Sequence, residues 1–234
     1  MSLMVGSARI DENGKISGGK PGDQTGNEVS TQPYYVHSKG WICMRPKSVA
    51  VANAIAEAMI QACKNNNIGY CQGHRITVIE QLRKSGSLAK ISAKTEADCS
   101  SLVRACCIQA GFDPGNFNTS AEVSALKASK QFMEPITVTS GTKLCNGDIL
   151  VTKTKGHTVV VISGNPRQAV SHYPKYKGAS GSIVTALAAV GEKDTSKAHR
   201  AKIAAANGIK NYAYTAAQNL EMVNLLKKGK LIKA

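Results

Sequence analysis

Three cysteines lie close together in the stretch EADCSSLVRACCIQAGF, residues 96–112. A cysteine acts as a nucleophile in its thiolate form, which the dipole and free backbone N–H groups of a helix N-terminus favour. Cys99 follows Asp98, a predicted helix cap, and begins a helical pattern. Cys106 and Cys107 fall in the body of that helix among apolar residues, where a thiol packs like a small hydrophobic group. Cys99 is therefore the candidate nucleophile.

A cysteine nucleophile also needs a base, commonly a histidine whose ring is oriented by a third group. His157 follows the turn KTKG and begins the extended run TVVVI. The end of a strand holds a side chain rigidly at the rim of a sheet, where the N-terminus of a helix can meet it. His199, in contrast, lies in a basic helical stretch and is predicted to face solvent. His157 is therefore the candidate base, and a histidine at a strand edge without any catalytic role is the alternative that its position alone would favour.

The third group is predicted from hairpin geometry. If SGNP, residues 163–166, turns the chain back, His157 faces His172 on the same side of the sheet. His172 is the first candidate for orienting the imidazole and Asn165 the second. A one-residue bulge would change the register and remove the argument.

The other cysteines, Cys43, Cys63, Cys71 and Cys145, are predicted to be structural thiols. An odd number of cysteines without a Cys-x-x-Cys pair favours reduced thiols over a disulfide framework. Cys71 and His74 are three residues apart, but no second pair lies at zinc-ligand spacing, so no metal is expected. The glycines near the N-terminus do not have the spacing of a phosphate-binding loop, so no nucleotide or other cofactor is expected.

The elements around these residues predict an α+β domain, with helices first and antiparallel strands afterwards. Apolar periodicity and capping residues predict helices over 47–64, 75–84, from Cys99 to Gly111, and over 120–132 with Thr119 or Ser120 as cap. Short β-branched runs predict strands at 136–139, 148–152 and 158–163. Asp148 is expected to shape a turn, and the run TVVVI has the composition of a central strand covered on both faces.

Composition divides the chain into two parts. Residues 1–172 are expected to form the catalytic domain, with 1–14 as a flexible lead-in, and 173–180 to be a linker. Residues 181–234 contain three helical stretches that end at glycines and predict a small all-helical module.

Net charge is concentrated towards the C-terminus. The chain carries a formal net charge of +15, and residues 173–234 hold 11 Lys and Arg against 3 Asp and Glu. This density favours an anionic polymer as partner, and nucleic acid, teichoic acid and a membrane surface all satisfy it. No apolar run is long enough to span a bilayer and the N-terminus lacks a signal-peptide pattern, so we expect synthesis in the cytoplasm without a signal peptide.

Three motifs, DCSSLV at 98–103, NGDILV at 146–151 and GHTVVVI at 156–162, together resemble NlpC-type and CHAP-type cell-wall cysteine peptidases. These papain-like domains carry the same three landmarks in the same order, and Gly-Tyr at 69–70 is similar to their upstream active-site tyrosine. Ser101 replaces the more usual glycine, Tyr70 lies further upstream than is typical, and the third catalytic residue has no motif match.

The resemblance implies a papain-like domain followed by a wall-binding module, as in the endolysins of phages that infect Gram-positive bacteria. It implies a peptidoglycan hydrolase in which Cys99 attacks an amide of the stem peptide, His157 serves as base and Tyr70 supports the site. An amidase and an endopeptidase both fit, and the partners would be peptidoglycan and anionic wall polymers. Such an enzyme waits in the cytoplasm and acts on the wall after release. A non-catalytic wall-binding or nucleic-acid-binding protein, and a cysteine acyltransferase or protease, are the alternatives.

Overall fold

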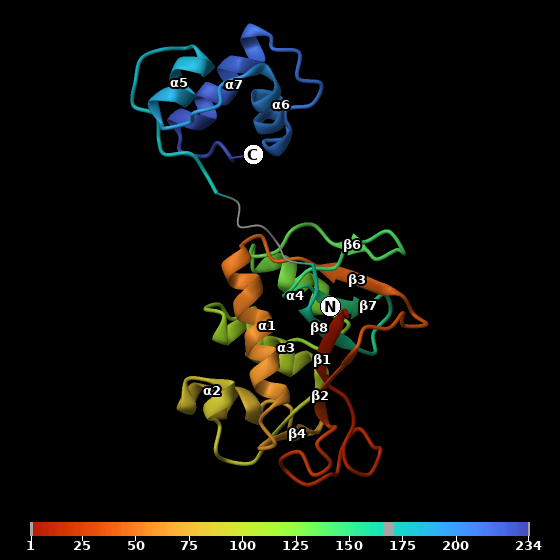
Figure 1. Cartoon of the computed structure of the whole chain (residues 1–234). Coiled ribbons are helices and arrows are strands. Elements are labelled where there is room, and N and C mark those ends of the chain that lie inside the picture. The colour runs from red at the N-terminus through yellow and green to blue at the C-terminus, as the bar shows by residue number, and fades with distance from the viewer. Residues whose placement is uncertain (1, 166–170, 234) are drawn as a thin grey trace. The chain divides into compact units, whose positions relative to one another are not determined.

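The computed structural model describes residues 2–165 and 171–233. The chain forms two compact units, Met1–Gln168 and Ala169–Ala234 (Figure 1). Each unit has its own buried core. The first unit contains the predicted catalytic residues Cys99 and His157, and the described part of the second contains helices and one isolated bridge, between His172 and Ile232.

A six-stranded sheet in which every neighbouring pair is antiparallel forms the centre of the first unit. Its order is β2-β1-β8-β7-β3-β6, with β1 Met4–Ala8, β2 Val29–Pro33, β3 Trp41–Met44, β6 Ile136–Thr137, β7 Ile149–Thr152 and β8 Thr158–Ser163. A separate parallel pair is formed by β4 (Ile68–Tyr70) and β5 (Thr95–Ala97).

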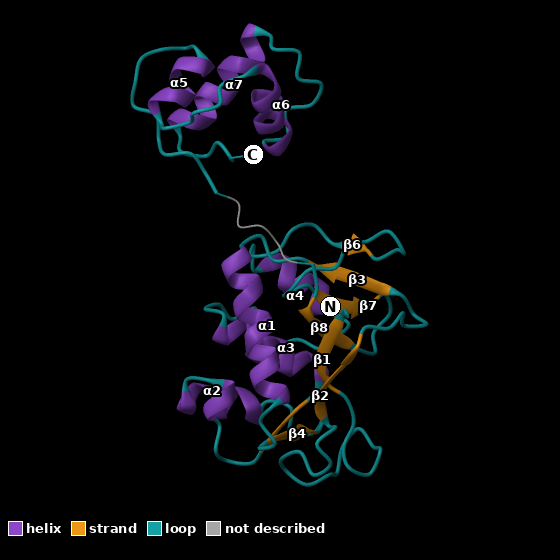
Figure 2. Cartoon of the chain, viewed as in Figure 1, coloured by secondary structure: helices purple, strands orange, loops and turns teal. Residues whose placement is uncertain are grey.

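Helices cover one face of this sheet (Figure 2). The helices on the sheet are α1 Val49–Cys63, α3 Cys99–Gln109 and α4 Glu122–Ala128. Helix α2 (Thr77–Ser85) packs on α3 and β5, next to a short 3-10 turn at Leu88–Lys90. Ser48 caps α1, since its side chain accepts a hydrogen bond from the backbone of Val51. Three of the four helices lie close to their predicted ranges, whereas α4 is shorter than predicted and its N-cap, Ala121, makes no side-chain cap bond.

The two faces of the sheet have separate cores. Along β8, Val160 packs with α1 and α3 in the larger core, whereas Val159 and Val161 point to the opposite face and pack with Trp41. Side chains alternate across a strand, so a run that is apolar at consecutive positions needs cover on both faces. The expectation of a doubly covered central strand at TVVVI is therefore met.

The N-terminus is part of the sheet, and the expectation of a flexible lead-in over 1–14 was wrong. Strand β1 lies between β2 and β8, and Val5 and Ala8 are fully buried. The residues MVGSA carry too short an apolar pattern to stand out in the sequence, and the partners of this strand are far along the chain. The same holds for the short strand β2, VSTQP, whose partner β1 lies more than twenty residues earlier.

The second unit packs α5 (Ile183–Ala189), α6 (Lys197–Ala206) and α7 (Ala216–Lys227) around a small core. Tyr173 and Tyr176 are buried in this core, so the predicted linker over 173–180 is wrong from its first residue. No helix in residues 2–165 or 171–233 is long and apolar enough to cross a membrane.

Candidate active site

Cys99 is the first residue of α3, and a double hydrogen bond fixes the start of this helix. The carboxylate of Asp98 accepts the backbone N–H of Ser101 at 2.6 Å, and the hydroxyl of Ser101 accepts the backbone N–H of Asp98 at 2.9 Å. This reciprocal arrangement is a capping box, which satisfies N–H groups that a helix start leaves without partners. Ser101, where the resembled family has glycine, thus has a structural role.

Arg75 ties this helix start to the rest of the unit. Its guanidinium contacts the carboxylate of Asp98 and donates to the hydroxyl of Ser100 at 2.8 Å. The same group also donates to the backbone carbonyl of Phe117. Arg75 could not be recognised from the sequence, because it lies more than twenty residues before the helix and in no recognisable motif.

A polar cavity of about 320 Å³ opens in front of the thiol. Cys99 and Ser100 contribute the helix start, Gln72 lies on the segment after β4, and Lys155 and Gly156 form the turn before His157. The backbone N–H of Gly156 donates to the Thr119 hydroxyl at 3.0 Å, which holds this turn against the segment before α4. Thr119 therefore anchors a turn and does not cap α4 as expected.

The backbone N–H of Thr158, the residue after His157, lies beside the Cys99 thiol, and Gly156, the residue before His157, lines the same cavity. His157 is itself fixed by Thr152, whose hydroxyl accepts the His157 N–H at 3.1 Å and whose own N–H donates to the His157 carbonyl at 3.0 Å. The imidazole ring lies 6.4 Å from the ring of Trp41, measured between centroids.

The Cys99 thiol and the His157 imidazole are both neutral at pH 7, because burial shifts their pKa values in opposite directions. Burial raises the pKa of the Cys99 thiol to about 12, assisted by the negative charges of Asp98 and Glu122, and the N–H groups of Thr158 and Ser100 only partly oppose this. Burial lowers the pKa of His157 to about 4, and the positive charges of His37 and Arg9 lower it further.

Glu122 of α4 and Tyr70 of β4 both lie near the Cys99 thiol. Glu122, at the start of α4, is fully buried and accepts the Thr158 hydroxyl at 2.7 Å. Burial raises its pKa well above the usual range. Tyr70 ends β4, and its hydroxyl accepts a hydrogen bond from the side-chain amide of Gln72 at 3.2 Å. Burial raises the pKa of Tyr70 to about 12, and the nearby Cys99 contributes to this rise.

Strand β8 does not form the predicted hairpin with the residues that follow it. Strand β8 pairs with β1 on one side and β7 on the other, so both of its edges are already occupied. His172 lies in the second unit and forms a bridge with Ile232. Asn165 follows the far end of β8 and donates to the carbonyl of Leu144 at 2.9 Å. The geometric reason for choosing either residue to orient His157 is thereby removed.

Asp148 closes the expected turn and also forms an ion pair with Arg45. It accepts the backbone N–H of Cys145 at 2.8 Å, which closes that turn. Its two carboxylate oxygens also accept hydrogen bonds of 2.9 and 2.7 Å from Arg45, which begins the segment after β3. This bidentate ion pair could not be predicted from the sequence, because Arg45 and Asp148 are about a hundred residues apart.

Comparison with known protein families assigns the first unit. A family model described as an endolysin-like domain matches residues 5–168. No match was found among curated proteins or among solved structures. The matched range spans most of the chain and includes the six-stranded sheet, Cys99 and His157. The chain therefore belongs to the endolysin-like domain family, which indicates a phage endolysin-type, cell-wall lytic function as a hydrolase acting on peptidoglycan.

Proposed function

We propose that this protein cleaves an amide bond of the peptidoglycan stem peptide with Cys99 as nucleophile, as a papain-like enzyme of the NlpC or CHAP type. Either an N-acetylmuramoyl-L-alanine amidase or an endopeptidase fits this chemistry. The observation that carries the proposal is the position of the Cys99 thiol. It lies at the start of α3, on a polar cavity that Gly156 also lines, and beside the backbone N–H of Thr158, the residue after His157.

The reaction would follow the general course of cysteine-dependent acyl transfer. The Cys99 sulfur attacks the carbonyl carbon of the amide while the thiol proton passes to the imidazole of His157. The carbon–nitrogen bond then breaks, and His157 returns the proton to the leaving amine. Water attacks the resulting thioester, releases the carboxylic acid and regenerates the thiol.

Two kinds of donor are available for the negative charge that develops on the carbonyl oxygen. Backbone N–H groups at the start of α3 point out of the helix, as in other anion-binding helix starts. The side-chain amide of Gln72 lines the same cavity and is held by the hydroxyl of Tyr70. Donors that are already in place stabilise a developing oxyanion without reorganisation. Tyr70 would then support catalysis by positioning Gln72.

The neutral state of both groups determines how the proton moves. With the thiol pKa raised to about 12 and the imidazole pKa lowered to about 4, the resting pair holds no thiolate–imidazolium charges at pH 7. Proton transfer would therefore accompany the attack of sulfur on the amide. Catalytic hydrogen bonds in unliganded enzymes are often long and shorten when substrate binds.

The decisive experiment compares two cysteine substitutions in the same helix. Cys99→Ala should abolish the loss of turbidity of susceptible cell walls while leaving the far-UV circular dichroism unchanged. Cys106→Ala is the matched control, since Cys106 is buried in the body of α3 and has no place in the cavity. Cys106→Ala should keep the lytic activity of the unsubstituted chain when the two are compared at equal concentrations of folded protein.

Full lytic activity of Cys99→Ala would refute the cysteine mechanism. In that case the lytic chemistry would lie in other residues, whereas a lack of lytic activity in the unsubstituted chain would favour a wall-binding or nucleic-acid-binding module. Mass spectrometry of peptidoglycan digested by the unsubstituted protein identifies the bond that is cut. New free amino termini at the start of the stem separate an amidase from an endopeptidase.

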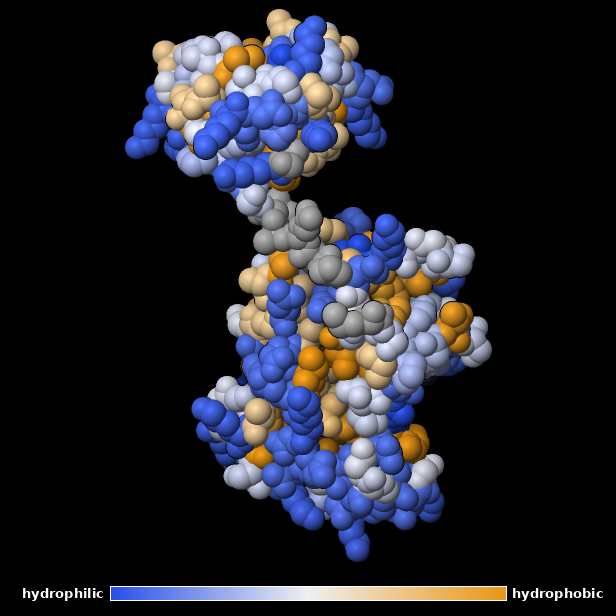
Figure 3. Space-filling model, viewed as in Figure 1, coloured by the Kyte–Doolittle hydropathy of each residue, from blue (hydrophilic) through white to orange (hydrophobic). Residues whose placement is uncertain are grey.

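We further propose that the second unit holds the enzyme on anionic wall polymers. It carries most of its charge as Lys and Arg, and hydrophilic side chains cover much of its visible face (Figure 3). Lys197 and Arg200 of α6 lie 5.5 and 5.7 Å from the ring of Tyr214, which is 37% exposed. Together they present cations beside an aromatic surface, and retention at the wall raises the local substrate concentration.

Because the second unit has its own core, it is suited to a separate binding test. Residues 169–234 fused to a fluorescent protein should sediment with purified cell walls. Substituting Lys197 and Arg200 by glutamine together should weaken this binding, and so should added salt, since both reduce charge attraction. A fusion that stays in the supernatant with walls but binds DNA would contradict the wall-anchoring role and favour nucleic acid.

A further inference from the structure

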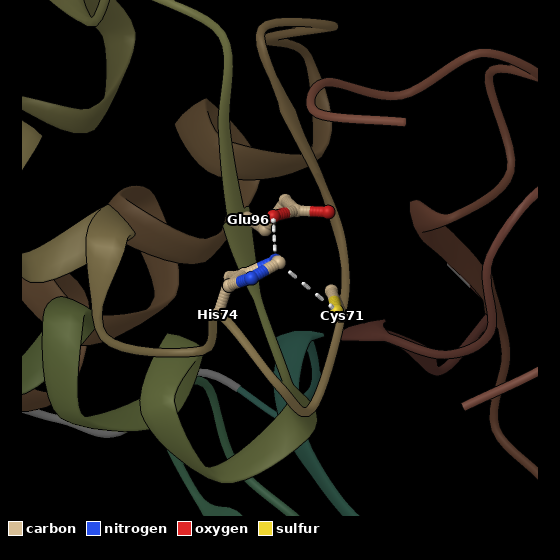
Figure 4. Close-up of side chains that lie close together, drawn as sticks. All are labelled: Cys71, His74 and Glu96. Atoms are coloured by element: carbon tan, nitrogen blue, oxygen red, sulfur yellow. Dashed lines mark hydrogen bonds and ion pairs between the residues drawn. The ribbon is translucent and has the colours of Figure 1, made fainter. Parts of the chain in front are cut away.

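A cluster of three potential metal ligands lies outside the catalytic cavity. Cys71 follows β4, Glu96 is the middle residue of β5, and His74 lies in the turn between β4 and α2. Figure 4 shows the three side chains pointing toward one another. One ligand atom from each lies within 4.8 Å of the other two. Cys71 and His74 alone were too few ligands for a site in the sequence, and the fold supplies Glu96 as the third.

The backbone around the cluster is well fixed. Cys71 extends the parallel pairing of β4 with β5, because its N–H donates to the carbonyl of Ala97 at 3.0 Å. Glu96 is held on both sides by the hydroxyl of Thr77, which accepts the Glu96 N–H at 3.0 Å and donates to the Glu96 carbonyl at 3.1 Å. Two of the three side chains are therefore presented by neighbouring strands, which position ligands more reliably than loops.

The carboxylate of Glu96 is buried and only half satisfied. Its side chain is 3% exposed, and one oxygen lies 2.9 Å from Nδ1 of His74. The other oxygen, Oε1, has no hydrogen-bond partner among the described residues. A buried carboxylate oxygen without a partner is costly, so each such group calls for an explanation. A bound cation would satisfy it.

The contacts of His74 have the geometry of chelation and not of a catalytic relay. In a cysteine–histidine–acid relay, the acid holds one ring nitrogen and the thiol contacts the other. Here the Cys71 sulfur, at 3.7 Å, and the Glu96 oxygen, at 2.9 Å, both approach Nδ1. Cys71 is also only 1% exposed, which leaves a substrate little access to its thiol. Three ligand atoms that converge in this way surround a single point.

The separations match those around a tetrahedral ion. Zinc bonds of roughly 2.3 Å to sulfur and 2.1 Å to nitrogen place these two atoms about 3.6 Å apart at a tetrahedral angle. The observed separation between Cys71 Sγ and His74 Nδ1 is 3.7 Å. The nitrogen–oxygen separation of 2.9 Å is shorter than the roughly 3.3 Å expected. A small rotation of the His74 side chain, which is 67% exposed, would correct this difference.

We propose that Cys71, His74 and Glu96 bind one divalent cation of the zinc type, with water as the fourth ligand. Thiolate, imidazole and carboxylate are together suited to zinc and poorly suited to magnesium or calcium, which prefer oxygen ligands. Binding releases the thiol proton of Cys71, so that a thiolate and a carboxylate together balance the charge of the ion. The ion links the end of β4, the turn before α2 and β5, next to the start of α3.

Cobalt(II) is the probe for this site, because a cysteine-ligated tetrahedral cobalt ion has sulfur charge-transfer and visible absorption bands. The reduced, chelator-treated full chain should bind one equivalent of cobalt with both bands, and zinc should displace it. His74→Gln, Glu96→Gln and Cys71→Ser should each weaken binding by more than the roughly 10- to 100-fold that loss of an outer-shell partner costs. His74→Gln is the safest variant for folding, because the imidazole is mostly exposed.

Two controls separate this site from other thiols. Cys63→Ala removes a thiol outside the cluster and should leave the cobalt spectrum unchanged. Cys99→Ala should also keep it, which distinguishes metal binding from the proposed catalytic pair. A folded full chain that binds no stoichiometric cobalt, or a spectrum that persists in His74→Gln and Cys71→Ser, would overturn the proposal.

Discussion

The backbone N–H of Thr158, at the start of β8, lies beside the thiol of Cys99, at the start of α3. His157 precedes Thr158, so its backbone lies close to Cys99, while its ring lies beside that of Trp41, which packs on the face of the sheet opposite α3. The contact also acts on the thiol itself, because hydrogen-bond donors favour the thiolate. Burial outweighs this effect, as do the carboxylates of Asp98 and Glu122. Substituting one neighbouring group at a time can therefore measure how much each contributes to the pKa of the Cys99 thiol.

Asp98→Asn should lower the pKa of the Cys99 thiol. The substitution removes the negative charge that is the largest cause of the raised pKa after burial, while the asparagine oxygen can still accept the Ser101 N–H. Alkylation of Cys99 by iodoacetamide, followed against pH by peptide mass spectrometry, measures the midpoint. A midpoint that is unchanged or higher than in the unsubstituted chain would contradict this account. Loss of the ion pair with Arg75 should also reduce stability, so the comparison is made on folded protein.

Arg9→Met should raise the pKa of His157. Burial is the main reason for the lowered value of about 4, and the positive charge of Arg9 contributes to the same direction. Removing a positive charge makes protonation of the imidazole easier. The ring proton of His157 in the NMR spectrum should titrate near pH 4 in the unsubstituted chain and at higher pH in the variant. A midpoint that stays the same or falls would show that Arg9 does not act on this ring.

The lowered pKa of His157 also predicts how stability depends on pH. Between about pH 6.5 and pH 4 the unfolded chain binds a proton at this histidine and the folded chain does not, so stability decreases as the pH falls through this window. The shift corresponds to at most about 3 kcal/mol. His157→Gln should lose less free energy of unfolding than the unsubstituted chain over this range, measured by urea denaturation. Parallel pH profiles of the two proteins would refute the prediction.

The helix of Cys99 and the strand after His157 could be predicted because their signals are local. An acidic cap before an apolar periodic stretch and a β-branched run after a turn are both contained in a few residues. Their proximity was expected from the resemblance of the motifs and not from the pattern itself.

Non-local pairing explains the main errors. The hairpin that suggested His172 assumed that β8 pairs with the residues that follow it, but β1, from the other end of the first unit, occupies that edge. Arg75, Glu96 and Glu122 were missed for a related reason. Each acquires its role only when distant segments fold together, and no spacing rule connects Glu96 with Cys71 before β4 and β5 pair.

Glu122→Gln should change the stability most at neutral and alkaline pH. Burial raises the pKa of Glu122 above its ordinary 4.5, so the folded chain keeps a proton that the unfolded chain has already lost. Stability from this group is therefore fully present below pH 4.5 and decreases as the pH rises. Glutamine does not titrate and retains an oxygen for the Thr158 hydroxyl. The free energy of unfolding of the variant relative to the unsubstituted chain should rise between pH 4.5 and pH 7, and a constant difference would contradict this.

Arg45→Met should be far more destabilising than the same substitution at Arg83. Arg45 forms a bidentate pair with the fully buried Asp148, and removing one member leaves an uncompensated buried carboxylate at a cost of about 3–5 kcal/mol. Arg83 is 61% exposed where it contacts Asp113, and such surface pairs contribute about 0–1 kcal/mol. Urea denaturation of both variants at pH 7 measures the difference. Adding Asp148→Asn to Arg45→Met should recover part of the loss, because it removes the unpaired charge. Equal effects of the two arginine substitutions, or a further loss in the double variant, would show that the Arg45–Asp148 pair does not stabilise β3 against β7 in this way.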